Sequence, residues 1–140
     1  ITCGALRDML QESGWTLTLQ ECMAHFVGHT VRNRRDLIEA NTGQPLTDAF
    51  MDEFYRRRNL RLDADITPIA HIHQAVQHVF DACRGQIACA SGADRFKINL
   101  MLNKVGLFDF FDGRIFSGHE MPHSKRPRLQ IRILRKLKRS

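Results

Sequence analysis

The sequence predicts an α/β protein whose first half is a helical module and whose second half contains a parallel sheet. Three observations carry this prediction. Apolar residues recur at helical spacing through most of residues 1–80, the pattern changes at Gly85 to short uninterrupted apolar runs, and a helical segment separates two of these runs. The chain has 140 residues, of which 43% are hydrophobic, so it is long enough to bury one core.

The first half is predicted to form five helices separated by turn signals. The first helix has an apolar stripe made of Ala5, Leu6, Met9 and Leu10. The other four are expected to begin at Thr18, near Thr30, near Thr47 and at Thr67-Pro68. Thr18 and Glu21 have the spacing of a capping box, in which each side chain bonds the backbone amide of the other residue. The run Arg56-Arg57-Arg58 is expected on the solvated side of its helix.

The second half is predicted to form a strand, a helix and a strand. Gln86–Ala90 is a short apolar run of the kind found in a parallel strand covered on both faces, and Arg114–Ser117 is a second short run. The intervening helix carries Phe96 and Leu100 and ends at Gly106. Two strands joined by a helix over so short a distance make a βαβ unit, in which the strands are parallel.

The net charge of +6 comes from the end of the chain. Seven of the 21 basic residues lie in residues 126–140, whereas positions 1–125 carry 14 basic and 15 acidic residues. The excess of basic residues therefore lies in the tail and not in the folded part. A nucleic-acid-binding module that uses this tail is an alternative function, but the tail contains no aromatic residue to stack on bases.

Composition also limits the class of protein. No stretch approaches the roughly 20 apolar residues of a membrane helix, and the first residues lack the pattern of a secretion signal, so we expect neither a membrane protein nor a secreted precursor. The four cysteines form no close pair, which argues against a zinc site or a redox motif and favours a cytoplasmic location. We predict no metal site in this sequence, because its histidine pairs lack a third ligand.

Ser91 follows the first predicted strand, at the edge where open parallel sheets bind ligands. Its hydroxyl, with the amides of Gly92 and Ala93, has the groups to hold a phosphate at the start of the next helix. The alternative is that Ser91 only caps this helix, and the residues alone favour the cap.

The second half resembles the haloacid dehalogenase-like hydrolases. The resemblance runs from residue 85 to residue 125 and rests on the segments Ile87–Ala93, Leu102–Asp112 and Ile115–Lys125. Within that superfamily it is closest to phosphatases and phosphoglucomutases that carry a helical cap inserted after the first strand. The resemblance implies a helical cap domain at 1–80, a partial Rossmann-like α/β core at 81–125 and a basic tail at 126–140.

The same resemblance implies roles for individual residues. Ser91 matches the second motif of the family, which hydrogen-bonds the transferring phosphoryl group, and Lys125 matches the third, whose ammonium offsets negative charge. In the cap, the turn Gly28–Arg32 resembles a stretch that faces the active site, which makes Thr30 and Arg32 candidates for substrate binding. For Thr30, a plain N-cap is the favoured alternative.

Two features of the family do not occur in this sequence. The family's aspartate nucleophile and its acid/base aspartate lie on a strand that would precede Ile1, and further acidic Mg²⁺ ligands would follow Lys125. We therefore expect a fragment that is inactive as given. The complete protein is expected to be a magnesium-dependent phosphatase, which forms an aspartyl-phosphate and acts on a small phosphorylated metabolite such as a sugar or sugar-acid phosphate.

Further expectations concern the complete protein and the tail. A phosphosugar mutase is the nearer alternative to a phosphatase, and the complete protein is expected to be a monomer without nucleic-acid or membrane partners. After Lys125 the family continues with a Pro-x-Pro-Asp sequence, whereas this chain has Arg126–Gln130 and a basic run. A slip of the reading frame just after Lys125 would produce such a tail.

Overall fold

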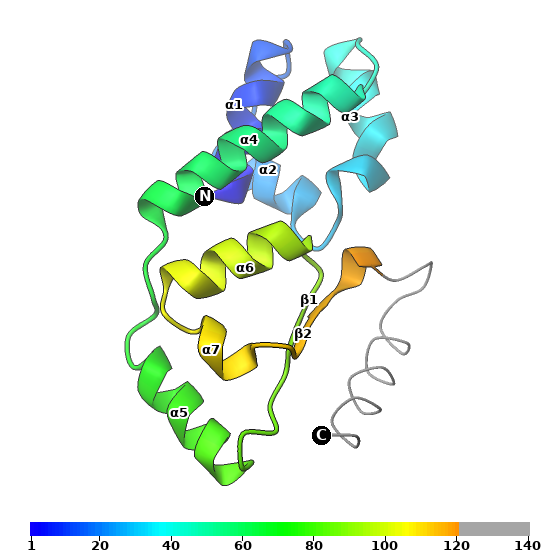
Figure 1. The fold of residues 1–140 in the computed structure, drawn as a ribbon. Coiled ribbons are helices and arrows are strands. Elements are labelled where there is room, and N and C mark those ends of the chain that lie inside the picture. The colour runs from blue at the N-terminus through cyan, green and yellow to red at the C-terminus, as the bar shows by residue number, and fades with distance from the viewer. Residues whose placement is uncertain (121–140) are drawn as a thin grey trace. The chain divides into compact units, whose positions relative to one another are not determined.

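The computed structural model describes residues 1–120, which fall into two compact units (Figure 1). The first unit is Ile1–Asp65, and the second begins at Ile66. The last of the five predicted helices belongs to the second unit, although the resemblance placed it in the cap at 1–80. Lys125 and the tail 126–140 lie outside the described residues.

The first unit is entirely helical. Its elements are α1 (Thr2–Glu12), α2 (Leu19–Phe26), the 3₁₀ helix η1 (Val31–Arg34), α3 (Arg35–Thr42) and α4 (Asp48–Asp65). Helix α1 packs against both α2 and α4. The predicted stripe of α1 is buried, and the core consists of Ala5, Leu6, Met9, Leu10, Leu17, Cys22, Phe26, Ile38, Leu46, Met51 and Phe54. Burial of this apolar surface is the main force that holds the unit together.

The start of α2 confirms the predicted capping box. The Glu21 backbone N–H donates to the Thr18 hydroxyl at 3.2 Å, and the Thr18 backbone N–H donates to the Glu21 carboxylate at 2.8 Å. Two amides that the helix leaves without a partner are thereby satisfied.

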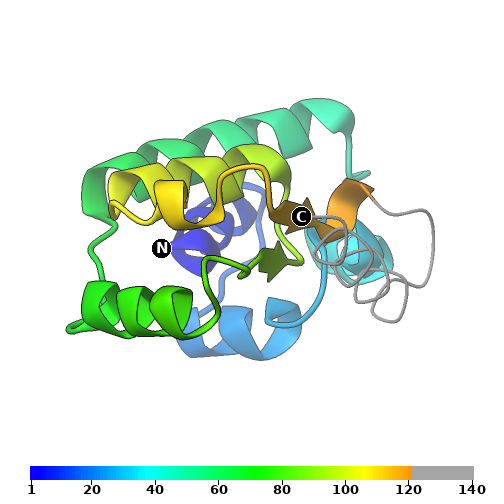
Figure 2. The ribbon, with the colours of Figure 1, turned by 60° about the horizontal axis from the view of Figure 1, so that its bottom comes forward.

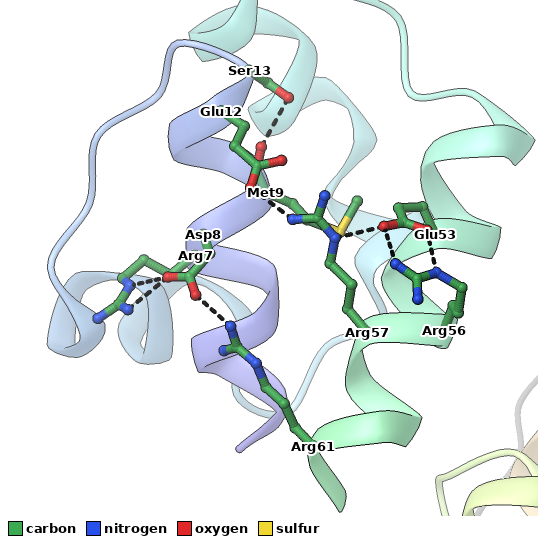
Figure 3. A network of polar contacts seen from close by, with 9 residues as sticks. All are labelled: Arg7, Asp8, Met9, Glu12, Ser13, Glu53, Arg56, Arg57 and Arg61. Carbon is green, nitrogen blue, oxygen red and sulfur yellow. Dashed lines mark hydrogen bonds and ion pairs between the residues drawn. The ribbon is translucent and has the colours of Figure 1, made fainter.

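A network of charged side chains joins α1 to α4 (Figure 3). Arg61 pairs with Asp8 at 2.6 Å, and Arg57 pairs with Glu12 of α1 at 2.7 Å and with Glu53 of its own helix at 2.6 Å. The expected solvated arginine face is therefore wrong for Arg58, whereas Arg56 is exposed and Arg57 is partly exposed. Arg57 bridges two helices, and Arg58 is 5% exposed, with its guanidinium 4.8 Å from the centre of the Tyr55 ring.

The second unit contains the predicted α/β element. Its elements are α5 (Ile72–Ala82), β1 (Cys89–Ser91), α6 (Arg95–Lys104), α7 (Phe108–Phe111), β2 (Ile115–Ser117) and the 3₁₀ helix η2 (Gly118–Glu120). Strands β1 and β2 pair in parallel, and their arrows point the same way in Figure 2. The fold class is therefore confirmed, with a helical unit followed by a small parallel sheet. Within residues 1–120, no helix has the length and apolar character needed to cross a bilayer.

Helix α5 begins later than Thr67-Pro68 predicts. His71 precedes it with a φ of 63°, and this left-handed backbone cannot continue a helix, so the first helical residue is Ile72. Pro68 consequently does not occupy the first helical position.

Strand β1 forms an open edge of the described sheet. The Cys89 N–H donates to the Arg114 carbonyl at 3.0 Å, on the side of β2. Because neighbouring residues of a strand point their backbone groups to opposite sides, those of Ala90 point away from β2. Residues 1–120 provide no further strand on that side, and Ala90 is exposed.

Candidate functional site

Ser91 lies at the carboxyl end of β1, directly opposite Ser117 of β2. The Ala93 backbone N–H donates to the Ser91 hydroxyl oxygen at 3.1 Å, which closes a tight turn. Among the described residues, no acceptor takes the proton of the Ser91 hydroxyl. A half-buried hydroxyl whose oxygen is fixed and whose proton is unused is suited to donate to a bound oxygen atom.

Gly92 follows Ser91 in the turn and has open space at its α-carbon. The residue is exposed, and apart from its two chain neighbours no described residue has an atom within 4 Å of a Cβ atom built on it. The Gly92 amide donates to no group in the described part of the chain. Ala93 differs, because its amide is already used by Ser91, so only two of the three predicted donors remain available to a ligand.

The cap of helix α6 is Asp94 and not Ser91. The Asp94 carboxylate accepts from the Lys97 backbone N–H at 2.9 Å, one residue before α6 begins. Ser91 cannot take this role, because its backbone still belongs to the β1 ladder. The Asp94 carboxylate also takes the place at the helix N-terminus where an anion would bind. A phosphate would therefore have to bind at the turn 91–93 and not at the helix end itself.

Arg95, the first residue of α6, is fully engaged. It forms two ion-pair contacts with the Glu120 carboxylate, one of them at 2.6 Å, and donates to the Ile115 carbonyl at 3.0 Å. The hydrogen bonds with Glu120 raise the pKa of the Arg95 guanidinium. Arg95 thus links the start of α6 to Ile115, at the start of β2, and to Glu120, at the end of η2. It is therefore not free to bind an anion.

The two cap candidates lie in the first unit. Thr30 is the N-cap of η1, where its hydroxyl accepts from the Asn33 N–H at 3.2 Å, as the favoured alternative predicts. Arg32 pairs with Asp48 at 2.8 Å, and both side chains are largely exposed. These contacts account for both residues within their own unit, and a substrate role for either stays a prediction.

The described residues do not fit a magnesium site. Mg²⁺ requires several oxygen ligands, usually with carboxylates among them. Within residues 1–120, no group of three or more histidine, cysteine, aspartate or glutamate side chains is placed to hold a metal ion. The tight turn at Ser91 therefore lacks the carboxylates that a bound cation would need.

Ser91 does not line either of two cavities found within the described part of the second unit. One, of about 350 Å³, is lined by Arg95, Asn99, Phe108, Asp112 and residues of β2. The other, of about 410 Å³, is apolar and lies between α5 and the segment before β1. The candidate site is the turn that follows strand β1.

The sequence prediction missed Ser117. This residue is 1% exposed, donates its hydroxyl proton to the Ala93 carbonyl at 2.6 Å and accepts from the His119 N–H at 3.1 Å. A signal was available, because a Ser-Gly pair stands at the carboxyl end of each predicted strand: Ser91-Gly92 directly follows Gln86–Ala90, and Ser117-Gly118 includes the last residue of Arg114–Ser117. Parallel strands place such repeated endings side by side.

Comparison with known proteins supports the fold. No protein-family model and no curated protein matches the chain. A solved structure of a haloacid dehalogenase-like protein of unknown function from Agrobacterium tumefaciens shares 20% sequence identity and a TM-score of 0.64, over 88% of this chain and 54% of that one. A protein from Thermotoga maritima, provisionally assigned as a beta-phosphoglucomutase, shares 14% identity and a TM-score of 0.72, over 98% of this chain and 63% of that one.

This chain spans between half and two thirds of the length of either structure. At these identities the likeness concerns the fold, which agrees with the motifs at residues 85–125. The chain therefore has the haloacid dehalogenase-like fold that its sequence predicts.

Proposed function

We propose that this chain is part of a phosphatase of the haloacid dehalogenase-like kind that acts on a small phosphorylated metabolite. The observation that carries the proposal is the Ser91 hydroxyl, whose oxygen is held by the Ala93 amide while its proton has no acceptor among the described residues. In this role the hydroxyl donates to an oxygen of the phosphoryl group, and the exposed Gly92 amide donates to a second oxygen.

The proposal assigns to this chain binding and orientation, and not attack on phosphorus. Transfer of a phosphoryl group depends largely on positioning and on charge stabilisation, and hydroxyl and amide donors supply both without covalent chemistry. Lys125 is proposed to add a positive charge beside the transferring group. The nucleophile and the Mg²⁺ ligands are proposed to belong to parts of the complete protein beyond the described residues, and no step is assigned to the metal here.

A phosphosugar mutase needs the same orientation of a phosphoryl group, so these residues favour neither reaction over the other. We further propose a monomeric complete protein in a cytoplasmic location, where Cys3, Cys22, Cys83 and Cys89 stay the free thiols that the structure shows.

The first test uses the chain of 140 residues. Inorganic phosphate should shift the amide NMR signals of Gly92 and Ala93, and Ser91→Ala should abolish the shifts. The matched control is Ser13→Ala, which removes a serine hydroxyl that bonds a backbone carbonyl in the first unit. The chain should hydrolyse no phosphomonoester, and turnover that disappears in Ser91→Ala would contradict this assignment of roles.

The second test adds the nucleophile and the acidic ligands that the proposal assigns to other parts of the complete protein. An Asp-x-Asp strand is added before Ile1, and residues 126–140 are replaced by the family's remaining strands and acidic ligands. This protein should hydrolyse phosphorylated metabolites in the presence of magnesium, and Ser91→Ala and Lys125→Ala should each lower turnover by orders of magnitude. A folded, magnesium-binding product that hydrolyses nothing across a broad panel would refute the proposed function.

A further inference from the structure

The end of strand β2 holds the turn that carries Ser91. Ser117 is the last residue of β2, and its buried hydroxyl donates to the Ala93 carbonyl at 2.6 Å. The same oxygen accepts from the His119 N–H at 3.1 Å. The Ser117 side chain therefore joins the turn after β1 to the turn after β2. Because both contacts are to backbone atoms, it fixes the backbone path of both segments.

Gly118 makes a second contact with the same turn. A Cβ atom built on Gly118 would lie 3.3 Å from the Gly92 Cα and 3.5 Å from the Ser91 carbonyl oxygen. The first distance is tighter than ordinary van der Waals contact, and both neighbours are backbone atoms that cannot rotate away. A glycine at this position therefore allows the two strand ends to approach closely.

Arg95 restrains the turn at the end where α6 begins. Its hydrogen bond to the Ile115 carbonyl at 3.0 Å fixes the start of α6 against β2. The segment between β1 and α6 is thus anchored at both ends, and Ser117 and Gly118 contact its middle.

We propose that Ser117 and Gly118 are positioning residues for phosphate recognition by the Ser91 turn. Ser117 does not touch the ligand, because its hydroxyl is buried and already both donates and accepts. Its role is to hold the Ala93 carbonyl, so that the Ala93 amide keeps its bond to the Ser91 oxygen and the Ser91 proton stays available. The effect on phosphate binding rests on the proposed function, whereas the effect on the turn does not.

The test measures the turn and the ligand separately in the chain of 140 residues. Amide hydrogen exchange at Ala93 reports the turn, and titration with inorganic phosphate reports the ligand. Ser117→Ala should speed exchange at Ala93 and weaken phosphate binding, each by about threefold to tenfold, as the loss of one hydrogen bond predicts. Ser117→Thr keeps the hydroxyl and should preserve both values better, and Ser13→Ala should change neither.

Gly118→Ala provides a second, independent variant. It keeps the Ser117 hydroxyl but inserts a methyl group against Gly92, so it should shift the Gly92 and Ala93 signals and weaken phosphate binding. This variant decides the question if Ser117→Ala unfolds the second unit. Unchanged exchange and unchanged phosphate affinity in either folded variant would overturn the proposal. If the unaltered chain binds no phosphate, the proposed function fails, while the exchange at Ala93 still decides whether Ser117 holds the turn.

Discussion

Replacing Leu10 with alanine tests whether the core assigned to the first unit carries its stability. Leu10 is 0% exposed and belongs to the buried cluster formed by α1, α2, α3 and α4. Removing a fully buried leucine side chain costs about 3–5 kcal/mol, because the transfer energy is lost and a cavity remains. A unit of this size has a free energy of unfolding of about 3–10 kcal/mol, so the substitution removes a large part of it.

Leu60 provides a matched control, because it lies on α4 with 59% of its surface exposed. Leu60→Ala should change the free energy of unfolding by no more than about 0.5 kcal/mol. Trp15 is the single tryptophan of the chain and packs against the core of the first unit, so its fluorescence reports on this unit alone. Leu10→Ala should lower the melting temperature by about 12 °C or more. Equal shifts for the two variants would refute the assigned core.

Three further predictions concern charge. Hydrogen bonds from Arg56 and Arg57 lower the pKa of Glu53 from 4.5 to about 2. The ion pairs of Glu53 therefore stabilise the first unit above pH 4.5, and this stabilisation is lost as the pH falls toward 2. In Glu53→Gln, the stability of the first unit, followed by Trp15 fluorescence, should fall less over that pH range. Asp94→Asn keeps a capping oxygen but removes a negative charge near the Ser91 turn, so NMR titration should show phosphate binding strengthened by about twofold. Nucleic-acid binding, if detected by fluorescence anisotropy, should be weak, independent of sequence, lost in moderate salt and abolished by deletion of residues 126–140; tight, salt-resistant, selective binding would favour the alternative function.

Features that depend on neighbouring residues could be predicted from the sequence. The capping box at Thr18 and Glu21 and the buried stripe of α1 each involve residues within one or two helical turns. The parallel pairing of β1 and β2 was also predictable, since a strand, a helix and a strand leave few other arrangements.

Features that depend on strand register were not predictable in this way. From the residues alone Ser91 is the favoured cap of α6, and this prediction is wrong, because Asp94 is an equally good capping residue and takes the position. The position of the cap follows from strand β1. Because β1 pairs with β2 up to the pair of Ser91 and Ser117, α6 begins only after Asp94. The bond between Ser117 and Ala93 likewise joins residues that only the register brings together.

The candidate site is therefore a property of two paired strand ends and not of the Ser91 turn alone. The pairing that aligns Ser91 with Ser117 extends over three residues of each strand, and the backbone groups of Ala90 on the outer edge of β1 have no strand partner among residues 1–120. So short a ladder is weak, and an open edge readily recruits another chain. A further strand along Ala90 would hold β1 from both sides and thereby fix the position of Ser91. Phosphate binding by the Ser91 turn should accordingly be tighter when a further strand pairs with β1.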